Sequence, residues 1–261
     1  MKIENIIHSK GFSILVSFLP FLLITGPFLS DLLVSLTSII FLIYLFLKKK
    51  LGFLNNSFFY FFIFFCIVFI ISSLISINVM LSFESSLFYF RIFTFSFLIC
   101  YLINHNKKIL IYFYNVLLFC FLILIIDSYL QFIFGKNIFL MPADYGRISS
   151  FFGTELVLGS FLSRLFLLFF SLFLIKKKNY YDKYIIAIIF ISLDVLIYIT
   201  GERTAFALLN VSTIFIIIII DKYKIFRLIT FLISLIIIFG ITFLVKILGI
   251  EWSINQLMIF N

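Results

Sequence analysis

Charged and helix-breaking residues are both scarce in this sequence. Only 12% of its 261 residues are charged and 3 are proline, whereas 64% are hydrophobic and 41 are phenylalanine. This composition is typical of a polytopic membrane protein. Only helices and closed barrels satisfy their own backbone hydrogen bonds in lipid, so each long apolar run predicts a spanning helix.

Cysteine and histidine are equally rare. The cysteines Cys66, Cys100 and Cys120 all lie in apolar segments, without the CxxC or Cys/His spacing of a metal site or a disulfide framework. The two histidines are His8, near the amino terminus, and His105, in an Asn-rich turn. The sequence therefore predicts no metal site and no cofactor.

Nine apolar runs are long enough to be considered as membrane spans. They lie near residues 12–28, 31–47, 58–77, 82–103, 109–130, 156–175, 184–200, 204–220 and 228–248. Pro20 and the pair Gly26 and Pro27 leave only a short first span, and a re-entrant hairpin is an alternative there. We predict an all-α fold, a polytopic transmembrane helix bundle of about nine spans, with a single transmembrane domain over residues 1–261.

The net charge of +9 comes largely from short basic runs between apolar segments, a pattern typical of topology signals rather than of nucleic-acid binding. Alternate connections carry Lys2 and Lys10; Lys48, Lys49 and Lys50; Lys107 and Lys108; Lys176, Lys177, Lys178 and Lys183; and Lys222, Lys224 and Arg227. Positive charge favours the cytoplasmic side. We therefore predict the amino terminus inside, the carboxyl terminus outside, and no nucleic-acid partner.

The other ionisable residues of the spans collect toward the predicted outer face. They are Glu84, Arg91, Asp127, Arg147, Glu155, Arg164, Asp194, Glu202 and Arg203. The clearest signal is the charged break TGERTA at residues 200–205, which separates two apolar runs. Ionisable side chains at membrane depth cost roughly 2.5–3.5 kcal/mol each on insertion scales, so they persist where they pair, touch water or handle a substrate.

Four arginines dominate this group. Arg91 and Arg164 each lie roughly 13 Å below the outer boundary, which is too deep for easy snorkelling, so both are predicted to point into the bundle. Together with Arg147 and Arg203 they suit an anionic ligand, because a guanidinium group binds phosphate oxygens bidentately and keeps its charge when buried. The alternative is that these charges form buried ion pairs that fix helix register.

Spacing and position add to the interpretation of four charged residues: Glu84, Arg91, Asp127 and Lys246. Glu84 and Arg91 are seven residues apart on one helix face, about 10 Å along the axis, so each is expected to have a partner elsewhere. Asp127 and Lys246 lie near the ends of predicted helices. We interpret both as groups that reach water.

Three stretches resemble motifs of one family. Residues 147–164, RISSFFGTELVLGSFLSR, resemble the loop-to-helix signature of bacterial O-antigen ligases and O-antigen polymerases. Residues 200–206, TGERTAF, resemble the short Gly-x-Arg turn of that family, and residues 82–91, SFESSLFYFR, are similar to a third stretch. The three matches occur in order and span the middle of the chain.

The resemblance implies a membrane glycosyltransferase of the GT-C type in the bacterial inner membrane, involved in lipopolysaccharide biosynthesis. Its donor would be an undecaprenyl-diphosphate-linked glycan at the periplasmic face. By carry-over, Arg147 and Arg203 would hold the diphosphate, with Arg164 and Arg91 beside them. The supporting carboxylates would be Glu84, Glu155, Asp194 and Glu202. No metal or other cofactor is implied.

The chain also departs from the family pattern. Family members continue into a large periplasmic loop that bears a histidine, whereas this sequence stops at Asn261. Neither His8 nor His105 is predicted on the outer side, so the catalytic base is not assigned. We interpret the chain as the N-terminal portion of a longer enzyme or as a degenerate, inactive member. Residues 251–256 would begin the missing loop or form a Trp-anchored tail.

Several functions remain open. A ligase transfers the glycan to lipid A core sugars, whereas a polymerase transfers it to another lipid-linked repeat unit, and the sequence favours the ligase. A transporter or flippase of lipid-linked glycans would also need arginines for a diphosphate. In a noncatalytic membrane subunit, the charges would only pair helices.

Overall fold

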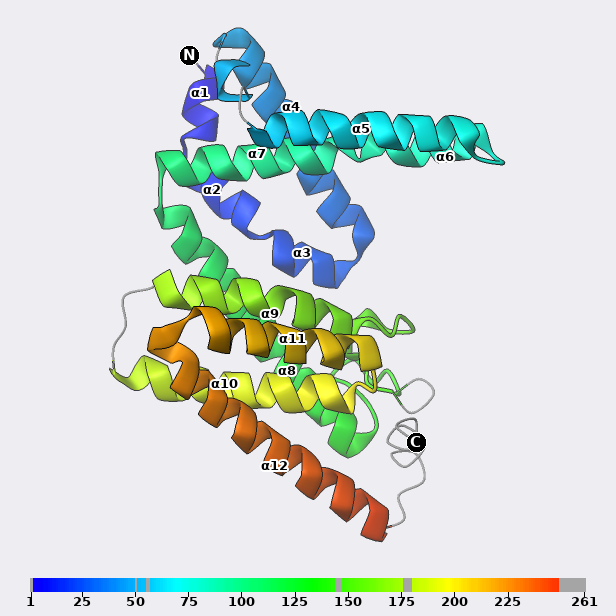
Figure 1. Cartoon of the computed structure of the whole chain (residues 1–261), viewed down its shortest axis with the longest axis vertical. Coiled ribbons are helices and arrows are strands. Elements are labelled where there is room, and N and C mark those ends of the chain that lie inside the picture. Colours follow the sequence, from blue (N-terminus) through cyan, green and yellow to red (C-terminus); the bar gives the residue numbers. More distant parts are fainter. Residues whose placement is uncertain (1, 50, 55–56, 144–146, 176–179, 249–261) are drawn as a thin grey trace. The chain divides into compact units, whose positions relative to one another are not determined.

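The structure, a computed structural model, describes residues 2–49, 51–54, 57–143, 147–175 and 180–248. These residues are mostly helical, and they include one isolated antiparallel bridge, between Lys136 and Pro142, but no named strand. The prediction of an all-α fold is confirmed for this part of the chain. By its internal contacts the chain divides into two compact units, residues 1–113 and 114–261 (Figure 1), and the single transmembrane domain stays a prediction.

The first unit contains the amino-terminal helices. They are α1 (Lys2–Ile7), α2 (Lys10–Ser17), α3 (Leu19–Thr25), α4 (Pro27–Leu47), α5 (Ser57–Ile75), α6 (Val79–Phe88) and α7 (Phe90–His105), with a 3-10 turn at Leu51–Leu54. Helix α4 packs against α3 and α7, and α5 packs against α6 (Figure 1). Helix α5 is apolar on all sides and only Ser73 is buried among its side chains, which is typical of a helix that faces lipid.

The first predicted span is not one continuous helix. Residues 12–28 are divided between α2 and α3, of 8 and 7 residues, and α3 ends where Gly26 adopts a φ of 121°. Pro27 then begins α4, a position that suits proline because the first backbone N–H of a helix has no partner within the helix. At 1.5 Å per residue, α2 and α3 are each only about 10–12 Å long, so neither can cross a bilayer alone.

Helix α8 (Lys108–Phe134) leads into the second unit, and the unit boundary falls after Phe113. The second unit continues with a 3-10 turn at Ser150–Phe152, α9 (Leu158–Ile175), α10 (Tyr180–Ile199), α11 (Arg203–Ile219), a 3-10 turn at Asp221–Tyr223, and α12 (Lys224–Leu248). Helices α9, α10 and α11 pack side by side, and α12 packs against α10 and α11 (Figure 1).

Phenylalanine packing forms the core of the second unit. Phe166, Phe169 and Phe170 of α9 are fully buried, and each has its ring centroid within 6.0 Å of the ring centroid of Phe190 in α10. A buried aromatic side chain hides about 150–250 Å² of its own surface, so clusters of phenylalanine dominate the packing between helices. This packing holds α9 and α10 together, and with them the loops that connect to their ends.

Six helical segments in the described residues are long and apolar enough to cross a membrane. They are Pro27–Leu47, Ser57–Ile75, Val79–His105, Lys108–Phe134, Leu158–Ile175 and Asp221–Leu244, and Arg203–Ile219 is a shorter apolar helix. This is the character of a multi-pass membrane protein. The count of nine spans and the sidedness stay predictions.

Candidate functional site

The charged break between α10 and α11 is a tight turn in the second unit. Gly201 has a φ of 72°, which a glycine adopts without strain, and α11 begins at Arg203. Glu202 between them is only 9% exposed. Its carboxylate accepts hydrogen bonds from the backbone N–H of Gly159 at 2.6 Å, the N–H of Ser160 at 2.9 Å and the hydroxyl of Ser160 at 2.5 Å.

These bonds satisfy two backbone N–H groups in the first turn of α9. The first four N–H groups of a helix have no partner within the helix, and the positive end of the helix dipole lies there. A carboxylate from another segment is therefore a strong cap, and it fixes the α10–α11 turn against the start of α9. The sequence predicts Glu202 to support the arginines, and the structure assigns its carboxylate to this cap.

Gly159 is required for this close approach. A Cβ atom added to Gly159 would lie 2.6 Å from the Thr200 hydroxyl oxygen and 3.0 Å from a carboxylate oxygen of Glu202. We expect Gly159→Ala to lower the free energy of unfolding by about 1–3 kcal/mol, because the new methyl group forces the α10–α11 turn away from α9. Unfolding of the purified protein in mixed detergent–SDS micelles would measure this change.

Gly240 in α12 provides the matched control. A Cβ atom at Gly240 would meet nothing within 4 Å. Gly240→Ala should therefore leave stability unchanged or raise it by up to about 1 kcal/mol, because alanine has the higher helix propensity. Equal effects of the two substitutions would contradict the close approach at Gly159.

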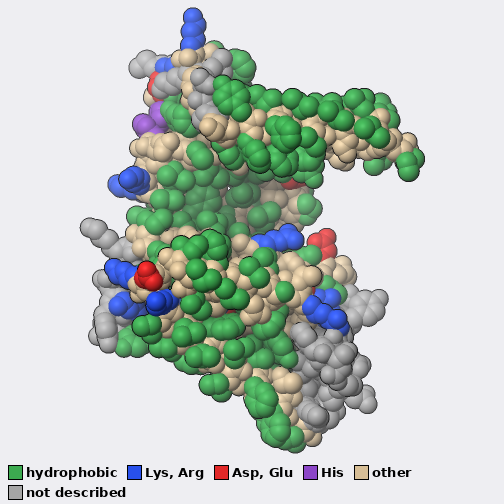
Figure 2. All heavy atoms as spheres, in the orientation of Figure 1, with side chains coloured by type: hydrophobic (Ala, Val, Ile, Leu, Met, Phe, Trp, Pro, Cys, Tyr) green, Lys and Arg blue, Asp and Glu red, His purple; other side chains and the backbone are tan. Residues whose placement is uncertain are grey.

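Three of the four predicted arginines lie at this end of the second unit. The guanidinium Nε of Arg147, which is half-buried, donates to the carbonyl of Thr200 at 3.2 Å, in the turn that leads to Arg203. Arg164 follows Ser160 by one turn of α9, on the same face, and both Arg164 and Arg203 are exposed. Figure 2 shows basic side chains over this end of the helix layer, and a second group over the end where α11 leads into α12.

Glu155 precedes α9 at the same end and is exposed. The exposure of Arg164 differs from the prediction that it points into the bundle. A side chain on the Ser160 face of α9 lies beside the turn rather than in the phenylalanine core. Within the second unit, Arg147 is thus half-buried, and Arg164 and Arg203 are exposed.

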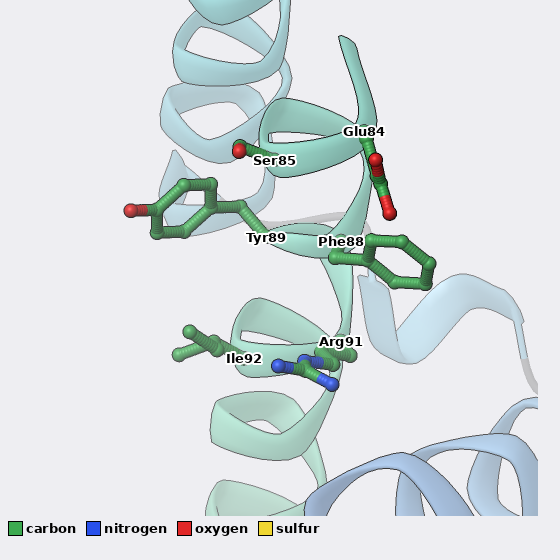
Figure 3. Close-up of a pocket in the computed structure, with 6 residues that line it drawn as sticks. All are labelled: Glu84, Ser85, Phe88, Tyr89, Arg91 and Ile92. Carbon is green, nitrogen blue, oxygen red and sulfur yellow. The ribbon is translucent and has the colours of Figure 1, made fainter. Parts of the chain in front are cut away.

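Arg91 belongs to the first unit and has its own partners. Its guanidinium donates to the carboxylate of Asp31 at 2.7 Å and to the hydroxyl of Ser35 at 3.3 Å, both in α4. The prediction that Arg91 pairs with a residue other than Glu84 is confirmed. Glu84 is exposed, and both residues line an open groove of about 510 Å³, with the Phe88 ring between them (Figure 3).

Asp194 is not placed with these three arginines. It is fully buried, and its carboxylate receives two hydrogen bonds from Arg227 of α12, at 2.8 and 2.9 Å. Thr213 of α11 accepts from the same guanidinium at 2.6 Å, and the Ser234 hydroxyl donates to Asp194 at 3.2 Å. The Arg227 guanidinium also lies 4.6 Å from the ring centroid of Phe166.

Arg227 therefore does not lie in a solvated connection between spans, as the sequence predicts, but in α12 with its side chain buried; its side of the membrane stays a prediction. Its side chain is 0% exposed and points among helices, whereas Lys222 and Lys224 nearby are exposed. The sequence carried one available signal: Arg227 directly precedes a long apolar run, and the buried carboxylate of Asp194 needs a cation. A basic side chain near the end of a span can extend to water or into the protein interior. Sequence position alone therefore does not distinguish a solvated arginine from a buried one.

The interpretation of Asp127 as a helix-end group in water is also wrong. Helix α8 continues to Phe134, and Asp127 is 0% exposed. Its carboxylate accepts from the N–H of Ile138 at 2.8 Å and from the hydroxyl of Ser150 at 2.5 Å. The predictions for the side chain of Lys246 and for residues 251–256 lie outside what the structure describes.

The site has the chemistry of an anion-binding site. Arg203 begins α11, whose first N–H groups receive no cap from the Glu202 side chain, and Arg147 contacts the Thr200 carbonyl in the turn before it. Arg164 is exposed one turn of α9 after Ser160. Helix amino termini and arginines both favour phosphate oxygens. Within the described residues, no group of three or more His, Cys, Asp or Glu side chains is arranged to hold a metal ion.

Fold and site together define a class: a mostly helical, multi-pass membrane protein that carries Arg147, Arg164 and Arg203 toward one end of its second helical unit. No protein-family model, no curated protein and no solved structure matches the chain.

Proposed function

We propose that the arginine end of the second unit binds the diphosphate of an undecaprenyl-linked glycan, and that the glycan is transferred to lipid A core sugars, as in O-antigen ligases. The supporting observation is the contact of Arg147 with the Thr200 carbonyl. This contact joins two segments about 50 residues apart in the sequence, so Arg147 lies beside the turn that leads to Arg203. Arg164 adds a third guanidinium one helical turn beyond the Glu202 cap.

The proposed chemistry is displacement at the anomeric carbon of the donor. An acceptor hydroxyl forms the new glycosidic bond, and the bond between the anomeric carbon and the diphosphate oxygen breaks. Negative charge develops on the departing diphosphate, and preorganised guanidinium groups in a poorly hydrated site stabilise that charge. The acceptor hydroxyl loses its proton to water or to a base that this proposal does not assign to a residue.

The sidedness of the reaction follows from the basic residues at the other end. Lys222 and Lys224 mark the end of α11 opposite to Arg203. If these lysines lie in the cytoplasm, as the positive-inside rule predicts, the arginine end lies at the periplasmic face of the bacterial inner membrane. A lipid-linked donor on that face would reach it laterally from the bilayer.

Binding of undecaprenyl diphosphate to the protein in lipid nanodiscs tests the proposal. Arg147→Ala and Arg203→Ala should each weaken binding by about 10- to 100-fold, because each removes one or more charge-assisted hydrogen bonds to phosphate. Arg164→Ala should act in the same direction. Native mass spectrometry of the lipid-bound protein would measure the change.

Lys224→Ala is the matched control, because it removes one positive charge from the opposite end of the unit. Its binding should stay within about twofold of the unmodified protein, since exposed charges at that distance are screened. Undecaprenol, which lacks the diphosphate, should compete poorly. Equal binding of the two lipids, or no effect of the arginine substitutions, would sink the proposal.

The polymerase reaction remains the alternative within the same proposal. It uses the same donor and differs only in the acceptor, which would be another lipid-linked repeat unit. Incubation of the protein with a labelled donor and either acceptor would separate the two. For the pair of Asp194 and Arg227, the geometry favours the noncatalytic role of joining helices.

A further inference from the structure

Helix α8 carries a buried polar face at its end. Asp127 and Gln131 are one helical turn apart and both are 0% exposed. Gln131 accepts hydrogen bonds through its side-chain oxygen from the N–H groups of Ser149 at 3.1 Å and Ser150 at 2.8 Å. Together with the bonds of Asp127 to Ile138 and Ser150, these contacts fasten both sides of the α8–α9 loop to α8.

A second layer of bonds closes the loop on itself. The side-chain amide of Asn137 donates to the carbonyl of Ser150 at 2.9 Å, and its oxygen accepts from the N–H of Met141 at 2.8 Å. Ser150 adopts a φ of 52°, a conformation that is unfavourable for a residue with a side chain. Such a conformation persists only where the surroundings hold it, and the bonds from Asp127, Gln131 and Asn137 do so.

The fastened part of the loop lies directly beside Arg147. Arg147 lies two residues before Ser149, and Ile148 between them is 1% exposed. The guanidinium of Arg147 reaches in the other direction, to the carbonyl of Thr200. A continuous set of contacts therefore connects α8, through Ser149 and Ser150, to Arg147 and the α10–α11 turn.

We propose that Asp127 and Gln131 are positioning residues for Arg147. The inference rests on the proposed function, since it gives Arg147 a diphosphate to bind. Neither side chain needs to touch that ligand. They hold the backbone of Ser149 and Ser150 so that the Arg147 guanidinium is preorganised beside Arg203, which lowers the conformational freedom lost on binding.

Substitution of Asp127 tests this role in the full chain. Asp127→Ala should weaken binding of undecaprenyl diphosphate about tenfold, because it releases two of the bonds that order the loop. Asp127→Asn should bind within about threefold of the unmodified protein. The carboxamide keeps an acceptor for the Ile138 N–H, and the Ser150 hydroxyl can turn to accept from the amide.

Ser128→Ala is the matched control. Ser128 is buried on the same helix, and its hydroxyl has no hydrogen-bond partner in the described structure. This substitution should change neither binding nor amide exchange. Hydrogen exchange across residues 147–153 provides a readout that needs no ligand. Gln131→Leu should speed it, since the N–H groups of Ser149 and Ser150 lose their acceptor. Asp127→Ala should speed it as well, since the Ser150 hydroxyl loses the carboxylate that holds this part of the loop on α8.

The decisive comparison is a double substitution with Arg147→Ala. If Asp127 acts through Arg147, Asp127→Ala should cause no further loss of binding once Arg147 is removed. The same loss in both backgrounds, or unchanged exchange at residues 147–153, would overturn this inference alone. Absence of undecaprenyl diphosphate binding to the unmodified chain would overturn the proposed function and the inference together.

Discussion

Arg227→Met is expected to lower the free energy of unfolding by about 3–5 kcal/mol, because it leaves the carboxylate of Asp194 buried without its cation. Both side chains are 0% exposed, and the guanidinium makes bidentate bonds to Asp194 and further bonds to Thr213. Because the pair is shielded from solvent, the carboxylate has no ready replacement for these partners. Unfolding in mixed detergent–SDS micelles would measure the change.

Removal of both charges should behave differently. The double substitution of Asp194→Leu with Arg227→Met should recover most of the lost stability, since a buried ion pair replaced by apolar residues of similar volume is often neutral. Lys224→Met is the control, because Lys224 is half-exposed and lies 3.5 Å from the largely exposed carboxylate of Asp221. It should change stability by less than about 1 kcal/mol. Additive losses in the double variant would contradict a direct pair.

Glu202→Ala is expected to have the second largest effect. It removes all three hydrogen bonds to Gly159 and Ser160 and leaves the first turn of α9 without its cap. Charge-assisted hydrogen bonds contribute about 1.5–3 kcal/mol each and are not additive, so we expect a loss of about 3 kcal/mol or more. Binding of undecaprenyl diphosphate should weaken as well, because the turn that carries Arg203 is released from α9.

Two further variants define the role of Glu202. Glu202→Gln keeps one acceptor oxygen but loses the charge, and it should retain a substantial part of the stability. Glu155→Ala removes an exposed carboxylate from the same end of the unit. It should stay within about 0.5 kcal/mol of the unmodified protein. Equal losses of stability in Glu155→Ala and Glu202→Ala would contradict the role of Glu202 as the cap of α9.

Much of the helical pattern was predictable, because apolar runs and the glycine, proline and charged residues that interrupt them can be recognised in the local sequence. The run at residues 109–130 lies within α8, and the run at residues 156–175 ends where α9 ends, at Ile175. The charged break at residues 200–205 correctly marked the turn between α10 and α11, since glycine and charge both interrupt a lipid-facing helix. The arginines Arg147 and Arg203 were singled out for the same reason, as charges in apolar surroundings.

The failures came from contacts that depend on tertiary structure. A cation three residues into α12 and a carboxylate in α10 are 33 positions apart, and nothing local indicates that Arg227 turns toward Asp194. Asp127 was placed in water because the apolar run seemed to end there, whereas the folded loop brings Ile138 and Ser150 over it. The periodicity of a sequence does not indicate which loop will cover the end of a helix, so the burial of Asp127 could not be predicted from it.

A structure of the protein in a lipid nanodisc with undecaprenyl diphosphate, determined by electron cryomicroscopy, is the most direct test of the central claim that the arginine end of the second unit binds a lipid diphosphate. We expect phosphate density within hydrogen-bonding distance of the guanidinium groups of Arg147 and Arg203. Phosphate density at the opposite end, beside Lys222 and Lys224, with the arginine end unoccupied, would contradict it.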